Sequence, residues 1–501
     1  MKTVCILLSV RLWLATVQAA PRPHIVFILA DDLGWDDVGY HGSIMKTPNI
    51  DALAAGGVKL ENYYMPSLCT PSRSVLLTGR YEIHTGLQHG TILMLQPLCL
   101  PFDEITLPQK LKEYGYSTNM VGKWHLGFYT KNCLPNHRGF DNFLGFYQAM
   151  EDYYYHNIST GSFNGWDFRR NDEPAHREYN GKYSTHIYAQ EAENIIMNHD
   201  ETTPLFLYLS FQAVHTPLQV PSEYSDMYKD IIPNDESRRT YAGMVTCMDE
   251  AVGNVTMALQ KRGLWENTVL IFSTDNGGLH FLGSNWPLRG GKGTLYEGGV
   301  HGVGFVNSPL LSDQVRGTVS HELIHISDWF PTLIQVAGGN LIGGRKLDGY
   351  NQWETISQGA PSVRQEMLLH IDPLYTAVKN VKDDIYSDNP YFNISMRAAI
   401  RVCDWKLITG APGNASWMAP SESGMDSVHP EKTPGKAVQL YNIAQDPYEK
   451  YNLAEAKPDI VIELLWRLRQ YYNSSVPPNF PQQDVKHANP ALFGGVWSPW
   501  Q

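Results

Sequence analysis

The chain of 501 residues is long enough to bury a large hydrophobic core, and it predicts one large domain with a smaller appended one. A hydrophobic fraction of 43% with 18% charged residues is typical of a folded globular protein and excludes an intrinsically disordered one. The net charge of −12 argues against a nucleic-acid-binding protein, which would carry a basic face, whereas an anionic substrate needs only a local cationic pocket.

Residues 1–20 have the features of a secretory signal peptide. A lysine is followed by an apolar stretch, Val4–Val10, and by small residues up to Ala19 that offer a cleavage site. Arg11 interrupts the apolar part, so an N-terminal extension without a signal role is the alternative. No other segment approaches the roughly 20 continuous apolar residues of a membrane span. We therefore expect a secretory-pathway protein, lysosomal or extracellular, with no membrane span. Five N-x-S/T sequons agree with glycosylation in that compartment, at Asn157, Asn254, Asn393, Asn414 and Asn473.

The first predicted strand, His24–Ala30, is a continuous apolar run, which is typical of a strand buried on both faces. It ends in two carboxylates, Asp31 and Asp32. By itself such a pair indicates an ordinary turn, because Asp is common in turns.

The next distinctive segment is a C-x-P-x-R motif that runs from Cys69 through Pro71 to Arg73. The following stretch, Ser74–Thr78, should begin a helix. The positive N-terminal end of that helix would favour negative charge on a bound ester.

Two further predicted strands are followed by basic and imidazole side chains. Ser117–Val121 precedes Lys123 and His125, and Leu205–Phe211 precedes His215. Helical patterns lie between the strands, and the clearest covers residues 241–263. Strands that alternate with helices predict an α/β fold with a mostly parallel central sheet flanked by helices. Ligands of such a sheet gather beyond the carboxyl ends of its strands.

The strand Thr268–Thr274 repeats the design of the first strand and ends in Asp275 and Asn276. Together with Asp31 and Asp32, these residues supply four hard oxygen ligands from two strand ends. Oxygen-only ligation suits Ca²⁺ or Mg²⁺, whereas zinc prefers the nitrogen and sulfur of His and Cys. The two strand ends together therefore favour a divalent metal site over two separate turns.

His321–His325 matches H-E-x-x-H, the zinc-protease motif, which works only on a helix. The surrounding residues are more typical of a strand, with a helix beginning near Trp329. Residues four apart on a strand are about 13 Å distant, too far to share one zinc ion. We therefore reject the protease interpretation.

The pattern changes near residue 390. Segments 397–409 and 439–443 are predicted to be antiparallel strands, and a helix is predicted over about 459–472. These elements predict a smaller α+β subdomain that carries an antiparallel sheet. The predicted division of the chain is a signal peptide at residues 1–20, a catalytic domain at 21–390 and a C-terminal subdomain at 391–501.

Four cysteines remain outside the signal segment and the C-x-P-x-R motif. Cys99 and Cys133 flank a strand-helix unit and form the predicted disulfide. Cys247 lies in a helical pattern and Cys403 in a strand-like one, and both are predicted to be buried free thiols.

With Gly79-Arg80 after it, the C-x-P-x-R motif resembles the signature of the type I sulfatases. Gly115–His125 resembles the second signature of that family, and Asn285–Gly299 resembles its substrate-loop segment, which contains Lys292. The resemblance covers most of residues 24–460 and is greatest to arylsulfatase B (N-acetylgalactosamine-4-sulfatase) and the arylsulfatase I and J proteins. It implies an alkaline-phosphatase-like fold.

The resemblance also implies that Cys69 is converted to Cα-formylglycine by the formylglycine-generating enzyme. In the family the hydrated aldehyde is the nucleophile. One calcium ion per chain would be held by residue 69 together with Asp31, Asp32, Asp275 and Asn276.

The remaining roles follow from the same resemblance. His215 and Lys292 would bind the sulfate and protonate the leaving oxygen. His125 would take the proton that allows sulfate to leave, and Arg73 and Lys123 would hold the nucleophile and offset negative charge. Fixed cations of this kind stabilise charge that develops in the transition state.

These features predict an enzyme that hydrolyses sulfate esters. The leading substrate is the N-acetylgalactosamine 4-sulfate of dermatan and chondroitin sulfate, and aryl sulfates are simpler substrates. Two alternatives are a phosphodiesterase or phosphonate hydrolase of the same superfamily, and a catalytically silent glycan-binding homologue. Leu95 and Asn414 stand where arylsulfatase B has cysteines, so we expect fewer disulfides and an altered substrate loop.

Overall fold

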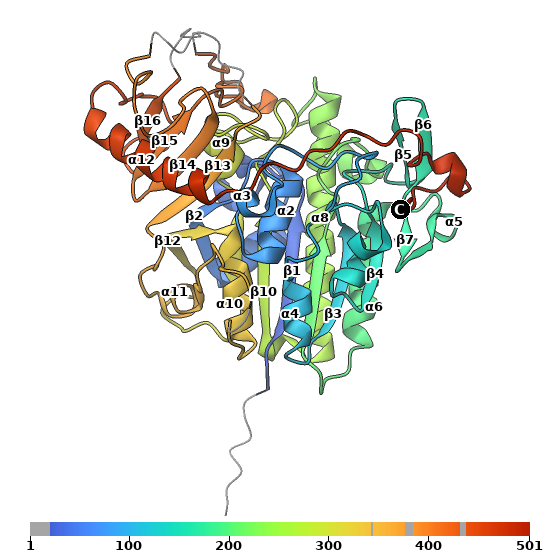
Figure 1. Cartoon of the computed structure of the whole chain (residues 1–501). Coiled ribbons are helices and arrows are strands. Elements are labelled where there is room, and N and C mark those ends of the chain that lie inside the picture. The colour runs from blue at the N-terminus through green and yellow to red at the C-terminus, as the bar shows by residue number, and fades with distance from the viewer. Residues whose placement is uncertain (1–20, 342–343, 376–383, 431–436) are drawn as a thin grey trace, which may run out of the picture.

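The computed structural model describes residues 21–341, 344–375, 384–430 and 437–501. Figure 1 shows a large sheet flanked by helices, with a smaller sheet next to it. The predicted signal segment, residues 1–20, lies outside the described residues. Within the described ranges, no helix has the length and apolar character that crossing a membrane requires.

The central sheet has ten strands and a parallel middle, as predicted. Five neighbouring strands in the middle of the sheet run parallel to one another, and so do the two strands at one edge. One antiparallel strand joins these two groups, and two further antiparallel strands extend the opposite edge. Across the sheet the order is β12 (Thr318–His325), β2 (Val58–Tyr64), β11 (Gly304–Asn307), β10 (Thr268–Thr274), β1 (His24–Ala30), β9 (Leu205–Ser210), β3 (Ser117–Lys123), β4 (Asn142–Phe146), β7 (Arg169–Arg170) and β8 (Glu173–Pro174). A separate hairpin consists of β5 (Asn157–Thr160) and β6 (Phe163–Trp166).

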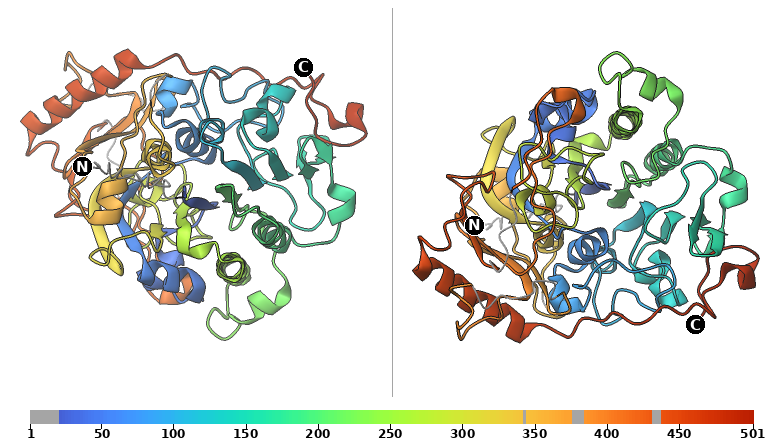
Figure 2. Two further views of the ribbon diagram at one scale, coloured as in Figure 1. Left: turned by 90° about the horizontal axis from the view of Figure 1, so that it is seen from below. Right: turned by 90° about the horizontal axis from the view of Figure 1, so that it is seen from above.

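Helices cover both faces of this sheet (Figure 2). One face packs against α1 (Pro48–Gly56), α6 (Ser184–Met197), α7 (Ser222–Asp226) and α8 (Glu236–Arg262). The other face packs against α2 (Cys69–Thr78), α4 (Leu107–Lys112), α10 (Trp329–Val336) and α11 (Trp353–Gln358). Short helices are α3 (Glu82–Thr85), α5 (His176–Tyr179) and α9 (Glu297–Val300).

The apolar runs of the central strands serve two separate hydrophobic cores. Successive side chains of a strand point to opposite faces. In β1, Val26 and Ile28 pack on the α8 side, whereas Ile25 and Phe27 pack on the α2 side. All four side chains are buried, and each such burial contributes about 1.5–3 kcal/mol. A strand with a core on both faces is therefore mostly apolar, and charged side chains appear where it ends.

The second sheet is antiparallel and has four strands, as predicted: β13 (Glu366–Asp372), β14 (Arg397–Val402), β15 (Trp405–Thr409) and β16 (Gln439–Asn442). One face packs against α12 (Pro458–Ser474), through Leu464 and Leu468 among others. The opposite face packs against Leu295 and Tyr296, which belong to the segment that precedes α9.

The predicted domain boundary near residue 390 falls between β13 and β14. The small sheet therefore takes a strand from each side of that boundary. After α12 the chain returns along the large domain, as the red trace in Figure 1 shows. There Asp484 bonds through its backbone to Leu95, and Trp497 bonds to Trp166 in β6. The division of the chain at residue 390 stays a prediction.

α2 begins earlier than predicted. Its first residue is Cys69 rather than a residue of Ser74–Thr78. Pro71 is tolerated because the amide groups of the first helical turn need no partner within the helix. Gly79 closes the helix in a left-handed conformation with φ of 67°. The candidate nucleophile therefore lies at the N-terminal end of a helix that is buried along its whole length.

The H-E-x-x-H segment lies on β12, as predicted, and α10 begins at Trp329. His321 is exposed, whereas His325 is buried and bonds to Ser327. The zinc-protease arrangement is therefore absent from this described segment.

Cys99 and Cys133 form a disulfide, as predicted. Cys247 is a buried free thiol, also as predicted. The prediction of a buried Cys403 is wrong, because this residue is exposed in the turn between β14 and β15, where its φ is 49°. The strand-like pattern around it belongs to two strands, and the cysteine lies between them.

Replacing both Cys99 and Cys133 with alanine should lower the free energy of unfolding by about 3–4 kcal/mol, since this cross-link closes a long loop of the unfolded chain. Thermal unfolding followed by circular dichroism measures the change. Cys403→Ala is the control and should shift stability by less than about 0.5 kcal/mol, because its side chain is exposed and forms no disulfide. An unchanged melting temperature in the double variant would contradict this prediction.

Candidate active site

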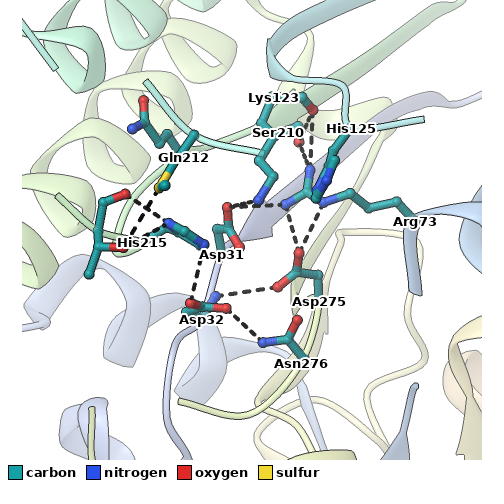
Figure 3. Close-up of polar contacts among 12 residues, drawn as sticks. Asp31, Asp32, Arg73, Lys123, His125, Ser210, Gln212, His215, Asp275 and Asn276 are labelled. Carbon is teal, nitrogen blue, oxygen red and sulfur yellow. Dashed lines mark hydrogen bonds and ion pairs between the residues drawn. The ribbon is translucent and has the colours of Figure 1, made fainter. Parts of the chain in front are cut away.

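The predicted polar residues meet at one edge of the central sheet. β10, β1, β9 and β3 are neighbours and run parallel, so their carboxyl ends lie at the same edge. Figure 3 shows the side chains that gather there: Asp31, Asp32, Arg73, Lys123, His125, His215, Asp275 and Asn276.

Four of these residues form a cluster of oxygen atoms. The Asn276 side-chain amide donates to Asp32 Oδ1 at 2.8 Å, and the Asp32 backbone N–H donates to Asp275 Oδ1 at 3.3 Å. Asp31 Oδ1 and Asn276 Oδ1 are buried and have no hydrogen-bond partner among the described residues. A buried oxygen without a partner costs about 1–3 kcal/mol. Free lone pairs beside two further carboxylates are what a hard cation would satisfy.

Arg73 and Lys123 pair with the outer carboxylate oxygens of this cluster. Arg73 donates from Nε and Nη2 to Asp275 Oδ2, at 3.0 and 2.8 Å. Lys123 Nζ donates to Asp31 Oδ2 at 2.5 Å. All four side chains are fully buried, and charges at such depth are stable only when they are paired.

Asp32 connects the cluster to two residues from other parts of the chain. Its Oδ2 accepts a hydrogen bond from Lys292 Nζ at 2.7 Å. His215 Nε2 lies 3.7 Å from the same oxygen. Lys292 comes from the loop before α9, so the predicted substrate-loop lysine does reach the strand ends.

Cys69 lies beside the oxygen cluster. Its Sγ and ligand atoms of Asp31, Asp32 and His215 are all within 4.8 Å of one another, a group that could hold a metal ion. Cys69 is the first residue of α2, so the partial positive charge of this helix end faces the same place. The sequence analysis predicts that His215 binds the substrate. The position of His215 in the structure suits contact with either a substrate or a metal ion.

His125 is held with one ring nitrogen free. Its Nε2 lies 3.2 Å from the carbonyl oxygen of Ile92, which assigns the proton to Nε2. Its Nδ1 is buried without a partner among the described residues. His125 and Asp32 also have positive φ, 54° and 59°. Such strained conformations cost about 1–3 kcal/mol and are typical of functional sites.

The carboxylates differ in how easily they hold charge. Burial raises the pKa of Asp31 to about 7, and repulsion from Asp275 adds to this despite Lys123 nearby. Burial acts on Asp32 as well, but Lys292 and the neighbouring positive groups outweigh it and hold its pKa below the usual range. The carboxylates of the site can therefore bind a further cation in addition to the lysine and arginine side chains that the chain supplies.

Burial is the main cause of the pKa shifts of the two histidines and of Cys69. Burial lowers the pKa of His215 to about 3, and burial with Lys123 and Arg73 holds the pKa of His125 well below its usual value. Both imidazoles are therefore neutral near pH 7. Burial raises the pKa of the Cys69 thiol to about 11, so an unmodified thiol would stay protonated and would be a weak nucleophile.

Sequence reasoning missed two residues that hold the site. Ser210 is the last residue of β9; its hydroxyl accepts from Arg73 Nη1 at 2.6 Å and donates to the Lys123 carbonyl at 2.8 Å. Tyr241 on α8 donates to Asp37 at 2.7 Å and lies 3.2 Å from the Asp32 carbonyl. A hydroxyl at the end of a buried strand was an available signal, whereas the tyrosine fitted the apolar helical pattern.

The loop that carries Lys292 is attached to the small sheet on its N-terminal side. Arg289 donates to the Ala415 carbonyl at 2.7 Å and to the Tyr441 hydroxyl at 2.9 Å. Its guanidinium also lies over the rings of Tyr296 and Trp417, 4.2 and 4.5 Å from their centroids.

On the C-terminal side the attachment is a buried charge cluster. Glu297 accepts from Lys406 Nζ at 2.7 Å, and Lys406 also lies 2.9 Å from a Glu449 oxygen. The other Glu449 oxygen accepts from the Glu297 backbone N–H at 2.7 Å. All three side chains are fully buried. The small sheet therefore fixes both flanks of the loop that carries Lys292.

The sulfatase family model matches residues 23–339. The chain belongs to the sulfatase family. It is 51% identical to arylsulfatase J of Mus musculus over 494 residues, which cover 97% of this chain and 81% of that protein. It is 30% identical to arylsulfatase A of Homo sapiens over 509 residues, which cover 95% and 93%. This protein is therefore an enzyme that hydrolyses sulfate esters, and the predicted family and enzyme class are confirmed.

Solved structures show the same fold. The crystal structure of Ps i-CgsB in complex with k-i-k-neocarrahexaose matches with a TM-score of 0.75 at 27% identity, over 94% of this chain and 98% of that one. The sulfatase yidJ from Bacteroides fragilis matches with a TM-score of 0.66 at 21% identity, over 93% and 98%. The second likeness concerns the fold alone, and the predicted alkaline-phosphatase-like fold is confirmed.

Replacing Lys406 with methionine should lower the free energy of unfolding by about 3–5 kcal/mol, because Glu297 and Glu449 would then face each other without their shared cation. Chemical denaturation measures the loss. The double variant Lys406→Met/Glu449→Gln should recover part of it, since the remaining carboxylate still lies 3.2 Å from His301. A single variant as stable as the original protein would show that the cluster does not fasten the small sheet.

Proposed function

We propose that this sulfatase acts on sulfated sugars, with formylglycine at position 69 and one bound calcium ion, and that its main substrate is N-acetylgalactosamine 4-sulfate in dermatan and chondroitin sulfate. The proposed nucleophile and calcium ion rest on one observation: a buried side-chain oxygen of Asp31 and one of Asn276 have no hydrogen-bond partner among the described residues, and Asp31 lies beside Cys69. These oxygens need a cation, and the cation would lie next to the candidate nucleophile.

The donor set suits calcium. Asp31, Asp32, Asp275 and Asn276 offer only oxygen atoms, and calcium accepts several oxygen ligands without strict geometry. These three carboxylates face three cations, Arg73, Lys123 and Lys292, so a divalent ion would leave the site positive and able to attract an anionic ester. When bound, calcium would supply positive charge that stabilises the negative charge of the reacting oxygens.

The environment of Cys69 supports its conversion to formylglycine. The residue is outside any disulfide, and its thiol is a weak nucleophile in this buried site. Formylglycine would supply an aldehyde whose hydrate is the nucleophile. Arg73 and Lys123 lie close enough to hold that group and to offset its charge, and conversion requires the formylglycine-generating enzyme as a partner in the secretory pathway.

The surrounding residues suit the remaining steps. Lys292 is cationic, since Asp32 outweighs burial and raises its pKa, and it would bind a sulfate oxygen. His215 would donate a proton to the leaving oxygen, because an anionic substrate favours its charged form as Asp32 does. His125 is neutral with a free Nδ1, so it can accept a proton when sulfate is released.

The substrate class is supported by relatives. N-acetylgalactosamine-6-sulfatase of Homo sapiens is 28% identical over 508 residues, which cover 96% of this chain and 91% of that protein. The complex with neocarrahexaose contains an oligosaccharide. A sugar sulfate therefore agrees better with these relatives than a phosphodiester. Cleavage of residues 1–20, glycosylation and a lysosomal or extracellular location complete the proposal.

The mass of the tryptic peptide that contains residue 69 tests the proposal most directly. Formylglycine there would support it, and an unmodified thiol in fully active protein would refute it. Release of sulfate from a chondroitin 4-sulfate oligosaccharide tests the substrate, and a preference for phosphodiesters would favour the rival superfamily activity.

The variant Cys69→Ser should complete at most one turnover. Serine has one hydroxyl on its Cβ, whereas hydrated formylglycine has two. The serine oxygen can attack sulfur, but the resulting serine sulfate has no second hydroxyl from which His125 could remove a proton. Intact-protein mass spectrometry should detect sulfate on residue 69. Sustained turnover by this variant would exclude the proposed nucleophile and favour direct attack by water.

Replacing Asp275 with asparagine should weaken calcium binding at least tenfold, because it removes one anionic ligand. Calorimetry on chelator-stripped protein measures binding, and kcat/KM should fall in parallel. Asp249→Asn is the matched control, since Asp249 is also buried but bonds to Asn49 and Ile50 between α8 and α1. Equal calcium affinity in the original protein and Asp275→Asn would remove this residue from the metal site.

A further inference from the structure

A cavity of about 340 Å³ lies beside the active site. It is formed between the loop that follows Asn276 and a segment before β16, residues 418–427. Its lining includes aromatic, thioether, hydroxyl and charged side chains, among them Phe281, Met418, Met425, Ser421, Ser427 and Arg238. This volume is near the lower limit for ligand pockets and has room for a sugar ring.

A short chain of hydrogen bonds connects the cavity wall to the oxygen cluster. Arg238 Nη1 donates to Asp37 Oδ1 at 2.9 Å, and the Tyr241 hydroxyl donates to Asp37 Oδ2 at 2.7 Å. The same hydroxyl lies 3.2 Å from the Asp32 carbonyl. This chain of contacts links the cavity wall to the backbone of Asp32, a proposed metal ligand.

A second connection leads from the cavity to Lys292. Phe281 lines the cavity, and the His280 ring lies 6.2 Å from it, centroid to centroid. A Cβ added at Gly291 would lie 3.2 Å from the His280 ring, so this ring lies against the residue before Lys292. Lys292 itself donates from its backbone N–H to the Gly278 carbonyl at 3.0 Å. The four residues Phe281, His280, Gly291 and Lys292 therefore form a continuous wall.

Two side chains of this wall, Phe281 and His280, are unusual in their exposure or their hydrogen bonding. Phe281 has 70% of its surface exposed, although it belongs to a loop that is otherwise largely buried. Both ring nitrogens of His280 are inaccessible to solvent and have no hydrogen-bond partner among the described residues. An imidazole has one donor and one acceptor, and leaving both unpaired is costly. His280 is not part of the cavity lining, so it acts on the cavity through its contact with Phe281.

The charges of the cavity do not favour a second anionic group. Arg238 is the cation in the lining, and its guanidinium is already paired with Asp37 and with Glu422, each at 2.9 Å. The hydroxyl of Ser421 donates to Asp235, which also lines the cavity. Recognition here would rest on packing against an aromatic ring and on hydrogen bonds, which is the chemistry that binds a sugar ring.

We propose that Phe281 binds the sugar residue attached to the sulfated one, and so sets the preference of this enzyme for glycans over simple aryl sulfates. The inference rests on the proposed function as a sugar sulfatase. Phe281 packs against the apolar face of the neighbouring ring, and His280, which lies between Phe281 and Gly291, positions it. Phe281 is a specificity-determining residue and His280 a positioning residue, and neither takes part in the cleavage of the ester.

Two substrates separate this role from catalysis. Phe281→Ala should lower kcat/KM for a chondroitin 4-sulfate tetrasaccharide about tenfold, the effect of losing one good packing contact, and should change kcat/KM for 4-nitrocatechol sulfate by less than about twofold. His280→Ala should act in the same direction. Phe102→Ala is the matched control: Phe102 is 54% exposed and is not part of the cavity lining, so neither substrate should respond.

Binding gives a readout that does not need turnover. In a Cys69→Ala background, calorimetry with the same tetrasaccharide should show about tenfold weaker binding when Phe281→Ala is added. Unchanged binding, or an equal loss of activity on both substrates, would overturn the inference. If the unaltered enzyme hydrolyses 4-nitrocatechol sulfate but not the tetrasaccharide, the proposed substrate is wrong, and the binding measurement still decides whether the cavity takes a sugar.

Discussion

The structure depends on three buried carboxylates that share one end of a parallel sheet. Asp31, Asp32 and Asp275 repel one another, and each needs a counter-charge that comes from outside β1 and β10, the strands they follow. The cations come from three different elements: Arg73 from α2, Lys123 from β3 and Lys292 from the loop before α9. Each of these elements is thereby fixed relative to the strand ends. The need to balance the charge of the site therefore also fixes the arrangement of the elements around it.

Much of this arrangement is readable from the sequence, for a physical reason. A strand buried on both faces, such as His24–Ala30, is mostly apolar, so the first carboxylates after it mark its end. In a parallel sheet those ends lie together. The sequence alone therefore predicts that Asp31, His125, His215 and Asp275 lie at one edge of the sheet. The family signatures assigned their roles, and the fold agrees with the placement.

Other features depend on contacts that no local pattern records. Lys406 looks like an ordinary strand residue, and only the packing of the small sheet against α9 makes it the shared cation of Glu297 and Glu449. Cys403 was misplaced because a short turn splits one apolar pattern into two strands. The start of α2 differs from the prediction because Pro71, a residue that disfavours the interior of a helix, lies in its first turn, where proline is tolerated. In each case the deciding interaction joins residues that are distant in sequence or masked by a neighbour.

The same distinction explains why the reaction is easier to predict than the substrate. Most of the proposed reacting groups stand at strand ends, where the sheet fixes them and permits few residue types. The cavity is formed largely by loops, including the segment at residues 418–427. Loop residues such as His280 and Phe281 can change without disturbing the carboxylate cluster or its cations. A sulfatase scaffold can therefore keep one chemistry while its loops change the choice of sulfate ester, and Lys292, at the junction of loop and cluster, is where the two requirements meet.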